Sequence, residues 1–396
     1  MVEMPTTVPV TPVDLDDAEA VTRADRGGVL RSAALAGAQI RATAAAVSEG
    51  ALARLDGARP RAVVIVAPSG PARRAAGLMS SLAADAGVPL VIAPSTPPWV
   101  GPLDVVVVAG DDAGDPVLAR SVDSAVRRRS DVVVTVPDEG PVADAGAGRV
   151  LALPPRVRVL DHHGFARHVA TMTAVLAAVD PSFDVGDPAE IADVVDAESA
   201  RHHASVEVFR NPAKSLASRV AGRRVLITGD GVAATELARH GASVLLRTAG
   251  VVAAASELAD AVAVVHEFGS VGGSGSDGSG HGVSQDYDPL FHDDQIDGPR
   301  PTEPVRILTV SIDPDDSSVR RRVAVLGEVD VVRVDDLSGD GSAPEMRPTP
   351  GFEAGRVGPG AITSAGGGVA TTVRQCLVLA ARLEAAAAYV QLAGGR

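Results

Sequence analysis

The sequence predicts an α/β protein made of two consecutive units, each a parallel sheet flanked by helices. Short apolar runs, such as 61–67, 104–109 and 131–136, are too brief for helices and alternate with helix-forming stretches. Strands with continuous Val, Ile and Leu are typical of parallel sheets that helices cover on both faces. The length of 396 residues also suits two domains better than one.

The first unit follows a helix-forming stretch over 13–53, which we expect to be an arm that packs or dimerises. A second group of strands begins after Asn211-Pro212, where we place the boundary between the units. The expected strands of the first unit are 61–67, 90–93, 104–109, 131–136 and 149–153, and its helices are 73–86, 116–129 and 165–179. The expected strands of the second unit are 224–228, 243–246, 305–311 and 329–334, and its helices are 233–239, 251–265, 317–326 and 369–392.

These elements divide the chain into four parts and one loop. We predict an N-terminal helical arm (1–60), a first domain (61–180), a linker helix (181–210, helical over 188–208) and a second domain (211–396). Within the last part, the Gly/Ser-rich segment 269–285 has too little apolar surface to order itself, so we expect a flexible loop.

The composition excludes several classes of function. A formal net charge of −14 opposes nucleic-acid binding, which needs a basic surface. The single cysteine, Cys376, rules out an internal disulfide and favours a reducing compartment. The start of the chain has no basic, then apolar, leader and no run of eighteen apolar residues occurs, so we expect a soluble cytoplasmic protein without a membrane partner.

The histidines do not indicate a metal site. His162-His163 and His202-His203 are adjacent pairs, whose side chains diverge in a helix or a strand. Glu198 and His202 share a helical face, which a surface i,i+4 pair explains.

Ligands of open parallel sheets bind at the carboxyl ends of the strands, where loops lead into helix N-termini that attract anions. The first unit has three such corners, at 68–71, 109–115 and 135–140. The middle corner carries Asp111 and Asp112, which would repel a phosphate dianion by about 1 kcal/mol per charge pair at about 4 Å in water.

These corners, the duplication and the final helix resemble the sugar isomerase (SIS) domain family. The resemblance is to its two-domain bifunctional phosphoglucose/phosphomannose isomerases and to the TobH-type proteins of high-GC bacteria. It implies two tandem SIS-like domains, a sugar phosphate as the small-molecule partner, a homodimer, no cofactor, and isomerisation of glucose, mannose and fructose 6-phosphate. The family's Gly-Gly-Ser turn, phosphate loop and Thr-Ser-Gly-Gly-like turn are retained in part, which implies phosphate binding by Ser69, Gly70, Gly110, Gly114 and Thr135.

Isomerisation between an aldose and a ketose needs a carboxylate that moves a proton and a histidine that opens the ring. The family's Asn-Glu-Asn and Asn-His-Asn motifs are absent from 245–266. As substitutes we assign Glu267 as the proton shuttle and His292 as the ring-opening group, and the distinctive segment 287–294 is the best local candidate for a site.

Two alternatives come from other classes. In the first, catalysis is lost and the fold serves as a regulatory or structural homodimer in mannose-phosphate metabolism, with the helical arm and the final helix at the interface. In the second, Gly229 and Gly231 form a dinucleotide turn and Arg247, at the end of the next expected strand, accepts the 2′-phosphate of NADP in a reductase. A tight turn with close helix packing explains the same glycines, and we favour that explanation.

Overall fold

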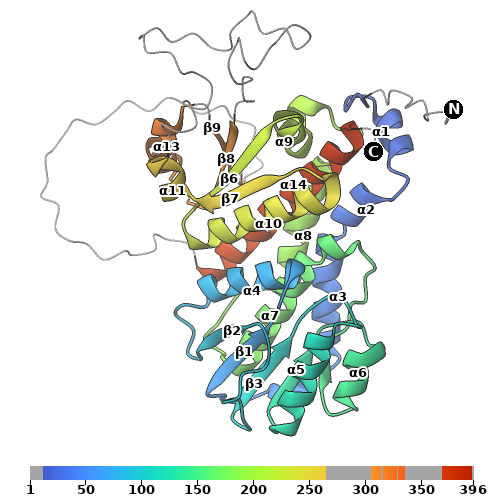
Figure 1. The fold of residues 1–396 in the computed structure, drawn as a ribbon, viewed down its shortest axis with the longest axis vertical. Coiled ribbons are helices and arrows are strands. Elements are labelled where there is room, and N and C mark those ends of the chain that lie inside the picture. Colours follow the sequence, from blue (N-terminus) through green and yellow to red (C-terminus); the bar gives the residue numbers. More distant parts are fainter. Residues whose placement is uncertain (1–11, 265–304, 314, 328, 335–367, 395–396) are drawn as a thin grey trace, which may run out of the picture.

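The computed structural model describes residues 12–264, 305–313, 315–327, 329–334 and 368–394. Two separate parallel sheets form the centres of two α/β units, with strand orders β2-β1-β3-β4-β5 and β7-β6-β8-β9. Figure 1 shows the units one above the other along the longest axis, each with helices against its sheet. The predicted fold class is therefore confirmed.

The first sheet is built from the predicted apolar runs. All of its strand pairs are parallel, and β1 and β3 are buried along their whole length, as continuous valine runs require. Its strands are β1 (Ala62–Val66), β2 (Leu90–Ala93), β3 (Asp104–Val108), β4 (Asp131–Val134) and β5 (Leu151–Ala152).

Helices follow the strands of the first unit at its loop corners. Asp115 caps α5, because its carboxylate accepts the backbone N–H groups of Val117 and Leu118. The short helix α6 was not predicted from the sequence. The helices are α4 (Gly70–Leu82), α5 (Pro116–Arg127), α6 (Gly140–Gly146) and α7 (Phe165–Val179).

The second unit surrounds a parallel sheet of four strands. These are β6 (Arg224–Asp230), β7 (Ala253–Glu257), β8 (Val305–Ser311) and β9 (Val329–Val332). The described helices from the linker onward are α8 (Pro188–Arg201), α9 (Pro212–Val220), α10 (Val232–Ala249), α11 (Leu258–Ala263), α13 (Asp316–Val323) and α14 (Val369–Ala393).

Two predictions for the second unit were wrong. The expected strand over 243–246 is part of α10, and the expected helix over 251–265 is instead β7 followed by α11. A short apolar run is the same pattern in a strand and in a buried helix turn, so periodicity could not separate them. The alanines of β7 favour a helix locally, but pairing of Ala253 with Val225 of β6 overrides that propensity. The predicted linker helix also ends early, at Arg201.

The helical arm consists of three helices, namely α1 (Ala18–Ala24), α2 (Val29–Ala33) and α3 (Ala36–Ser48). The break falls at Asp25, whose carboxylate accepts the N–H groups of Val29 and Leu30 and so starts α2. Helix α3 packs against α7 and α8. The arm therefore contacts helices from both the first domain and the linker.

A continuous apolar core joins the units. One cluster of buried side chains contains residues of both sheets, and α4 of the first unit lies beside α10 of the second (Figure 1). Helix α14 is long and apolar enough to cross a membrane, but 89% of its most apolar window is buried inside the protein, as in a core helix. That burial leaves little of α14 for the dimer interface expected on it.

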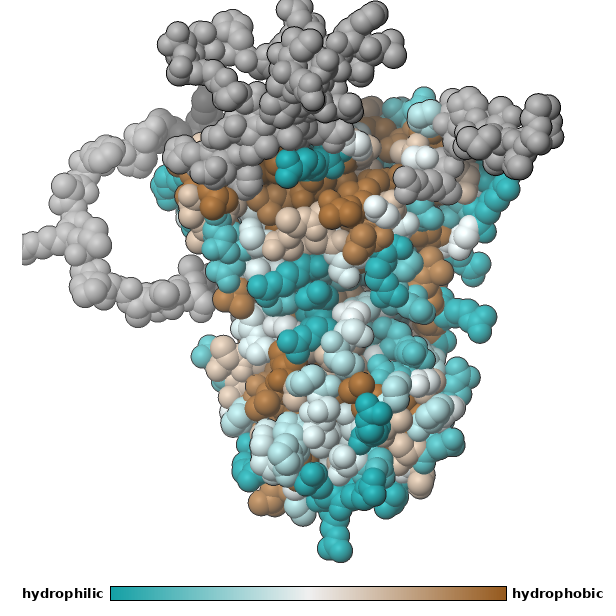
Figure 2. Space-filling model, viewed as in Figure 1, coloured by the Kyte–Doolittle hydropathy of each residue, from teal (hydrophilic) through white to brown (hydrophobic). Residues whose placement is uncertain are grey.

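The surface differs between the units. On the face in Figure 2, hydrophobic residues gather over the upper unit, while the lower unit is mostly hydrophilic or neutral. In the second unit Val232, Leu246 and Val252 are exposed large hydrophobic residues, at 71%, 54% and 80%.

Candidate functional site

A cavity of about 140 Å³ lies at the carboxyl ends of β1 and β3. It joins the predicted corners 68–71 and 109–115 with Asp161, which begins a short 3₁₀ helix (Asp161–His163), and with Arg247 of α10. Of the predicted phosphate ligands, Ser69, Gly70 and Gly110 line this cavity. Gly114 and Thr135 do not belong to its wall.

The N-terminus of α4 opens into this cavity. Ser69 is the N-cap residue but its hydroxyl makes no capping bond, and the first turn carries no acidic residue. Ser69, Gly70 and Pro71 all line the cavity. Because Pro71 has no N–H, the groups that this end of α4 offers to an anion are the backbone N–H groups of Ser69 and Gly70, the Ser69 hydroxyl and the positive end of the helix dipole.

Arg247 brings a positive charge to this corner from the other unit. It lies in the last turn of α10, not at a strand end, so the strand on which the NADP alternative relied was wrongly predicted. A Cβ atom built on Gly70 would lie 3.9 Å from Nη1 of Arg247. Arg247 is exposed and makes no hydrogen bond or ion pair with any described residue, so its guanidinium is available to a ligand.

The carboxylate of Asp111 is neutralised by the protein itself. Its Oδ1 accepts Nη2 of Arg167 at 2.7 Å and lies 3.1 Å from Nε2 of His168. Burial alone would raise the pKa of Asp111, but His168 and Arg167 hold it below its ordinary value. Burial lowers the pKa of His168, and Nε2 of its ring lies within hydrogen-bond distance of the Asp111 carboxylate. The repulsion expected from Asp111 is therefore largely cancelled.

Arg167 also fixes the loops of this corner. Its Nη1 donates to the carbonyl of Thr135 at 2.5 Å and its Nη2 reaches the carbonyl of Gly110. Its side chain is only 6% exposed. Arg167 is not among the site residues predicted from the sequence, although an arginine inside the apolar stretch 165–179 is a usable signal.

The other residues of the corner shape its backbone. Oδ1 of Asp112 accepts the N–H of Gly114 at 2.8 Å, so Gly114 belongs to a turn closed by Asp112. Thr135 is 1% exposed, and its hydroxyl has no partner among the described residues. The role of Thr135 in the structure is its carbonyl contact with Arg167.

The equivalent corner of the second unit is filled by the protein's own charges. Oδ2 of Asp230 accepts the hydroxyl of Ser311 at 3.0 Å and pairs with Arg322 at 2.6 Å. Arg322 also pairs with Asp313 at 2.8 Å. The guanidinium of Arg322 is therefore already paired with carboxylates of the protein, which disfavours binding of an external phosphate at this corner.

The glycines of that corner have a packing role. They lie in the predicted strand-to-helix turn between β6 and α10. A Cβ atom on Gly229 would overlap the backbone nitrogen of Thr235, and Gly231 has a φ of +95°. The turn needs these glycines for close helix packing and for its backbone conformation.

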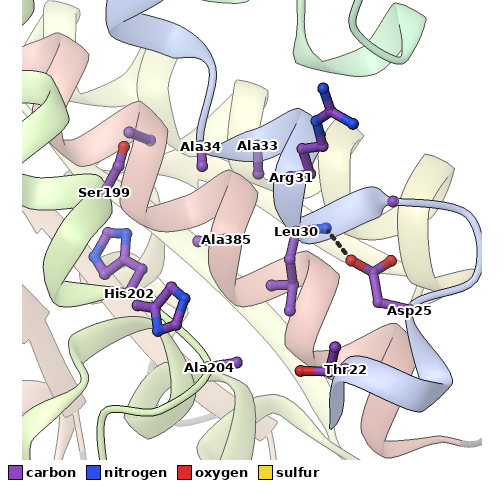
Figure 3. Close-up of a pocket in the computed structure, with 13 residues that line it drawn as sticks. Thr22, Asp25, Leu30, Arg31, Ala33, Ala34, Ser199, His202, Ala204 and Ala385 are labelled. Atoms are coloured by element: carbon purple, nitrogen blue, oxygen red, sulfur yellow. Dashed lines mark hydrogen bonds between the residues drawn. The ribbon is translucent and has the colours of Figure 1, made fainter. Parts of the chain in front are cut away.

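The two cavities of about 400 and 670 Å³ lie among helices away from the strand ends. The first lies between α2, α8 and α14, and alanines form much of its wall (Figure 3). Within the described ranges no group of three His, Cys, Asp or Glu side chains is arranged to hold a metal ion. The predicted catalytic residues Glu267 and His292, and the loop 269–285, lie outside the described residues.

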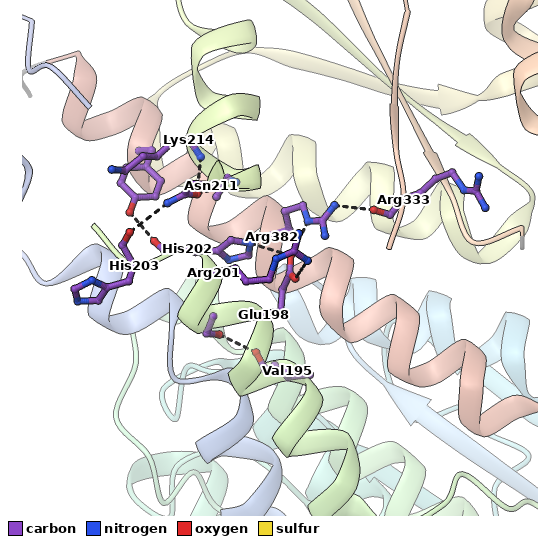
Figure 4. Close-up of polar contacts among 12 residues, drawn as sticks. Val195, Glu198, Arg201, His202, His203, Asn211, Lys214, Arg333 and Arg382 are labelled. Carbon is purple, nitrogen blue, oxygen red and sulfur yellow. Dashed lines mark hydrogen bonds and ion pairs between the residues drawn. The ribbon is translucent and has the colours of Figure 1, made fainter. Parts of the chain in front are cut away.

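Glu198 and His202 form a buried pair, so the expected surface pair was wrong. Glu198 is fully buried, and its Oε1 contacts Nε2 of His202 at 2.9 Å and Nε of Arg382 at 2.7 Å. Arg382 extends to the carbonyl of Arg333 (Figure 4). This network joins α8 to α14 and to the segment after β9, and it contributes to the packing between the elements rather than to a cavity at the strand ends.

No protein-family model and no curated protein sequence matches this chain. Solved structures with a similar fold include the C-terminal domain of glucosamine-fructose-6-phosphate aminotransferase from Francisella tularensis, with 10% identity and a TM-score of 0.56 over 95% of this chain and 96% of that one. Tagatose-6-phosphate ketose/aldose isomerase from Escherichia coli has 13% identity and a TM-score of 0.52 over 96% and 95% of the two chains. At such identity the likeness shows the fold alone, which is that of the SIS proteins.

Proposed function

We propose that this chain binds a sugar phosphate, with the phosphate between the N-terminus of α4 and Arg247. The observation that carries the proposal is the guanidinium of Arg247, which pairs with no described residue and which the second unit places beside Ser69 and Gly70 of the first. Guanidinium groups and uncapped helix N-termini are both preferred partners of phosphate.

The balance of charges favours binding. A charge-assisted hydrogen bond contributes about 1.5–3 kcal/mol, whereas repulsion of a phosphate dianion by one solvated carboxylate costs about 2 kcal/mol at about 4 Å, which is about 1 kcal/mol per charge pair. Asp111 is paired with Arg167, and Asp115 caps α5, so Asp112 and Asp161 are the remaining acids of the cavity wall. Two or three bonds from Arg247 and α4 outweigh these repulsions.

The substrate class follows from the SIS resemblance and from the fold. We propose glucose, mannose or fructose 6-phosphate as ligands and a protein of the phosphoglucose/phosphomannose isomerase or TobH type, soluble in the cytoplasm. Two proteins of similar fold are named for reactions of tagatose 6-phosphate and of fructose 6-phosphate, which supports a hexose 6-phosphate. Glu267 would move the proton between the adjacent carbons, and His292 would open the ring.

Binding and turnover are tested separately. Thermal-shift titration with glucose 6-phosphate is expected to stabilise the wild-type chain and to lose most of that shift in Arg247→Ala. Arg239→Ala is the matched control, because Arg239 lies on the same helix but pairs with Glu236. Equal shifts in both variants would exclude Arg247 from the site. Incubation with fructose 6-phosphate, followed by assay of glucose 6-phosphate and mannose 6-phosphate, tests isomerisation, which His292→Ala should abolish.

A second candidate function is a homodimer that binds the sugar phosphate without converting it. The exposed Val232, Leu246 and Val252 of the second unit favour association, since exposed apolar groups mark protein interfaces. Light scattering during size-exclusion chromatography should then give twice the mass of the chain, and Val252→Asp should halve it. A monomer that turns over fructose 6-phosphate would contradict this candidate.

A further inference from the structure

A second cavity adjoins the sugar-phosphate corner on the other side of Arg247. It has a volume of about 300 Å³ and lies between the loop after α1, the segment that carries His162, and the last turns of α10 and α14. Arg247 lines both cavities, while Asp161 faces the first and the next residue, His162, faces the second. The two spaces are therefore neighbours with different walls.

This second cavity contains polar groups that the protein leaves without partners. The hydroxyl of Thr248 has no hydrogen-bond partner among the described residues, although Thr248 is only 8% exposed. Nε2 of His162 is also buried and unpartnered within the described ranges. A buried polar group without a partner is costly, and native proteins usually satisfy such groups with water or a ligand.

The charge of the cavity is positive, in contrast to the chain's net −14. Arg26 and Arg247 both line it, both are exposed, and neither pairs with another described residue. Its one acid, Asp25, is already engaged by the N-terminus of α2, and Figure 3 shows its carboxylate directed at the N–H of Leu30. Two guanidinium groups are thus free to hold an oxyanion.

The remaining wall indicates what the oxyanion is attached to. Gln391, Thr248 and His162 offer a donor or an acceptor each, which suits hydroxyl groups. Burial, together with Arg247 and His240, lowers the pKa of His162 to about 4, so its ring is neutral at pH 7. Val29, Leu160 and Leu392 provide apolar surface for a short carbon chain.

We propose that this cavity is a separate binding site for a small hydroxylated phosphate or carboxylate, held by Arg26, Arg247 and Thr248. Because Arg247 lines both cavities, occupancy of one site changes the position of a cation that the other uses. The site is thus placed to couple a second ligand to sugar-phosphate binding. The proposal of a second site does not depend on which anion the first cavity binds, since the two cavities share only Arg247.

Calorimetric titration of the full chain tests this site with three probes, namely inorganic phosphate, glucose 6-phosphate and citrate. At least one probe is expected to bind at a site that Arg26→Ala weakens about tenfold, which is the usual effect of losing one charge-assisted contact. Arg23→Ala is the matched control, because Arg23 lies on the neighbouring helix turn and pairs with Glu19. Ser69→Ala should weaken binding only at the α4 site, because Ser69 does not line the second cavity. The two variants therefore distinguish loss of binding at the first site from loss of binding at the second.

Thr248→Val separates binding from folding. Valine has the shape of threonine without the unpaired hydroxyl, so the unfolding midpoint should stay or rise while the affinity of the same probe falls. Arg247→Ala should weaken both sites. The proposal is overturned if all three probes bind Arg26→Ala and Thr248→Val as they bind the wild type, or if none of them binds outside the site that Ser69→Ala weakens.

Discussion

Arg382 of α14 and Glu198 of α8 form an ion pair inside the protein, with Nε and Oε1 2.7 Å apart and both side chains at most 5% exposed. The two residues are 184 positions apart in the sequence. Burial would raise the pKa of Glu198, but its bonds to His202 and Arg382 lower it to about 2. The ion pair thus fixes the final helix against the linker helix.

Removing the charge of Glu198 should destabilise the whole chain. Glu198→Gln removes the carboxylate that pairs with the buried guanidinium of Arg382, and breaking a buried pair in this way costs about 3–5 kcal/mol. Urea unfolding measures the change. Glu190→Gln on the same helix is the control, because its side chain is 70% exposed and its loss should stay within about 0.5 kcal/mol. Similar midpoints for both variants would show that the pair contributes little.

His163 should contribute to the pH dependence of stability, together with His162. Burial lowers the pKa of His163 from 6.5 to about 4, although the nearby carboxylate of Glu384 acts in the opposite direction. A folded-state pKa below the unfolded one means that the stabilisation is complete above pH 6.5 and is lost as the pH falls to about 4. Each such histidine removes about 1.4 kcal/mol per pH unit in that window.

His163→Asn tests this assignment. The variant lacks the titrating ring, so its free energy of unfolding should fall less steeply between pH 6.5 and 4 than that of the wild type. His203→Asn, which changes an exposed histidine, should keep the wild-type slope. If the free energy of unfolding of His163→Asn depended on pH as that of the wild type does, another group would be responsible for the loss of stability at low pH.

The sequence predicted the fold better than the site. Short apolar runs predicted β2 and β8 with their observed bounds, and α7 also matches its predicted range, because strand and helix periodicity are local properties. The site depends on Arg247, whose place beside Ser69 results from the packing of α10 on α4. No local sequence pattern indicates such a contact. The sequence pointed to Arg247 only as an NADP ligand at the end of a strand, whereas the residue lies in helix α10.

The carboxylates show the same limit. Asp111 and Asp112 look equally repulsive in the sequence, but only Asp111 has Arg167 beneath it. Arg167 is 56 residues away, within an apolar helix. Pairing of this kind decides the electrostatics of a site and is visible only in three dimensions.

The strand-to-helix turn of the second unit predicts different effects for its two glycines. Gly229→Ala places a Cβ against the backbone of Thr235, so α10 must move and the loss should exceed about 3 kcal/mol. Gly231→Ala meets no atom within 4 Å but keeps a φ of +95°, which costs about 1–3 kcal/mol. Thermal unfolding of both variants shows which substitution lowers the stability more. If Gly231→Ala were the more damaging, close packing would not explain this turn.

Neutralising Asp112 should strengthen sugar-phosphate binding. In Asp112→Asn the side-chain oxygen can still accept the N–H of Gly114, so the turn is kept while one negative charge of the cavity wall is removed. Removing a repulsion of about 2 kcal/mol, the value for one carboxylate against a phosphate dianion, should tighten glucose 6-phosphate binding about thirtyfold in a calorimetric titration. Asp111→Asn makes the comparison informative, because it frees Arg167 from its partner and should lower stability as well. Weaker binding by Asp112→Asn would mean that this carboxylate contacts the ligand directly, for instance by accepting a sugar hydroxyl, and would place the phosphate away from the 109–115 corner.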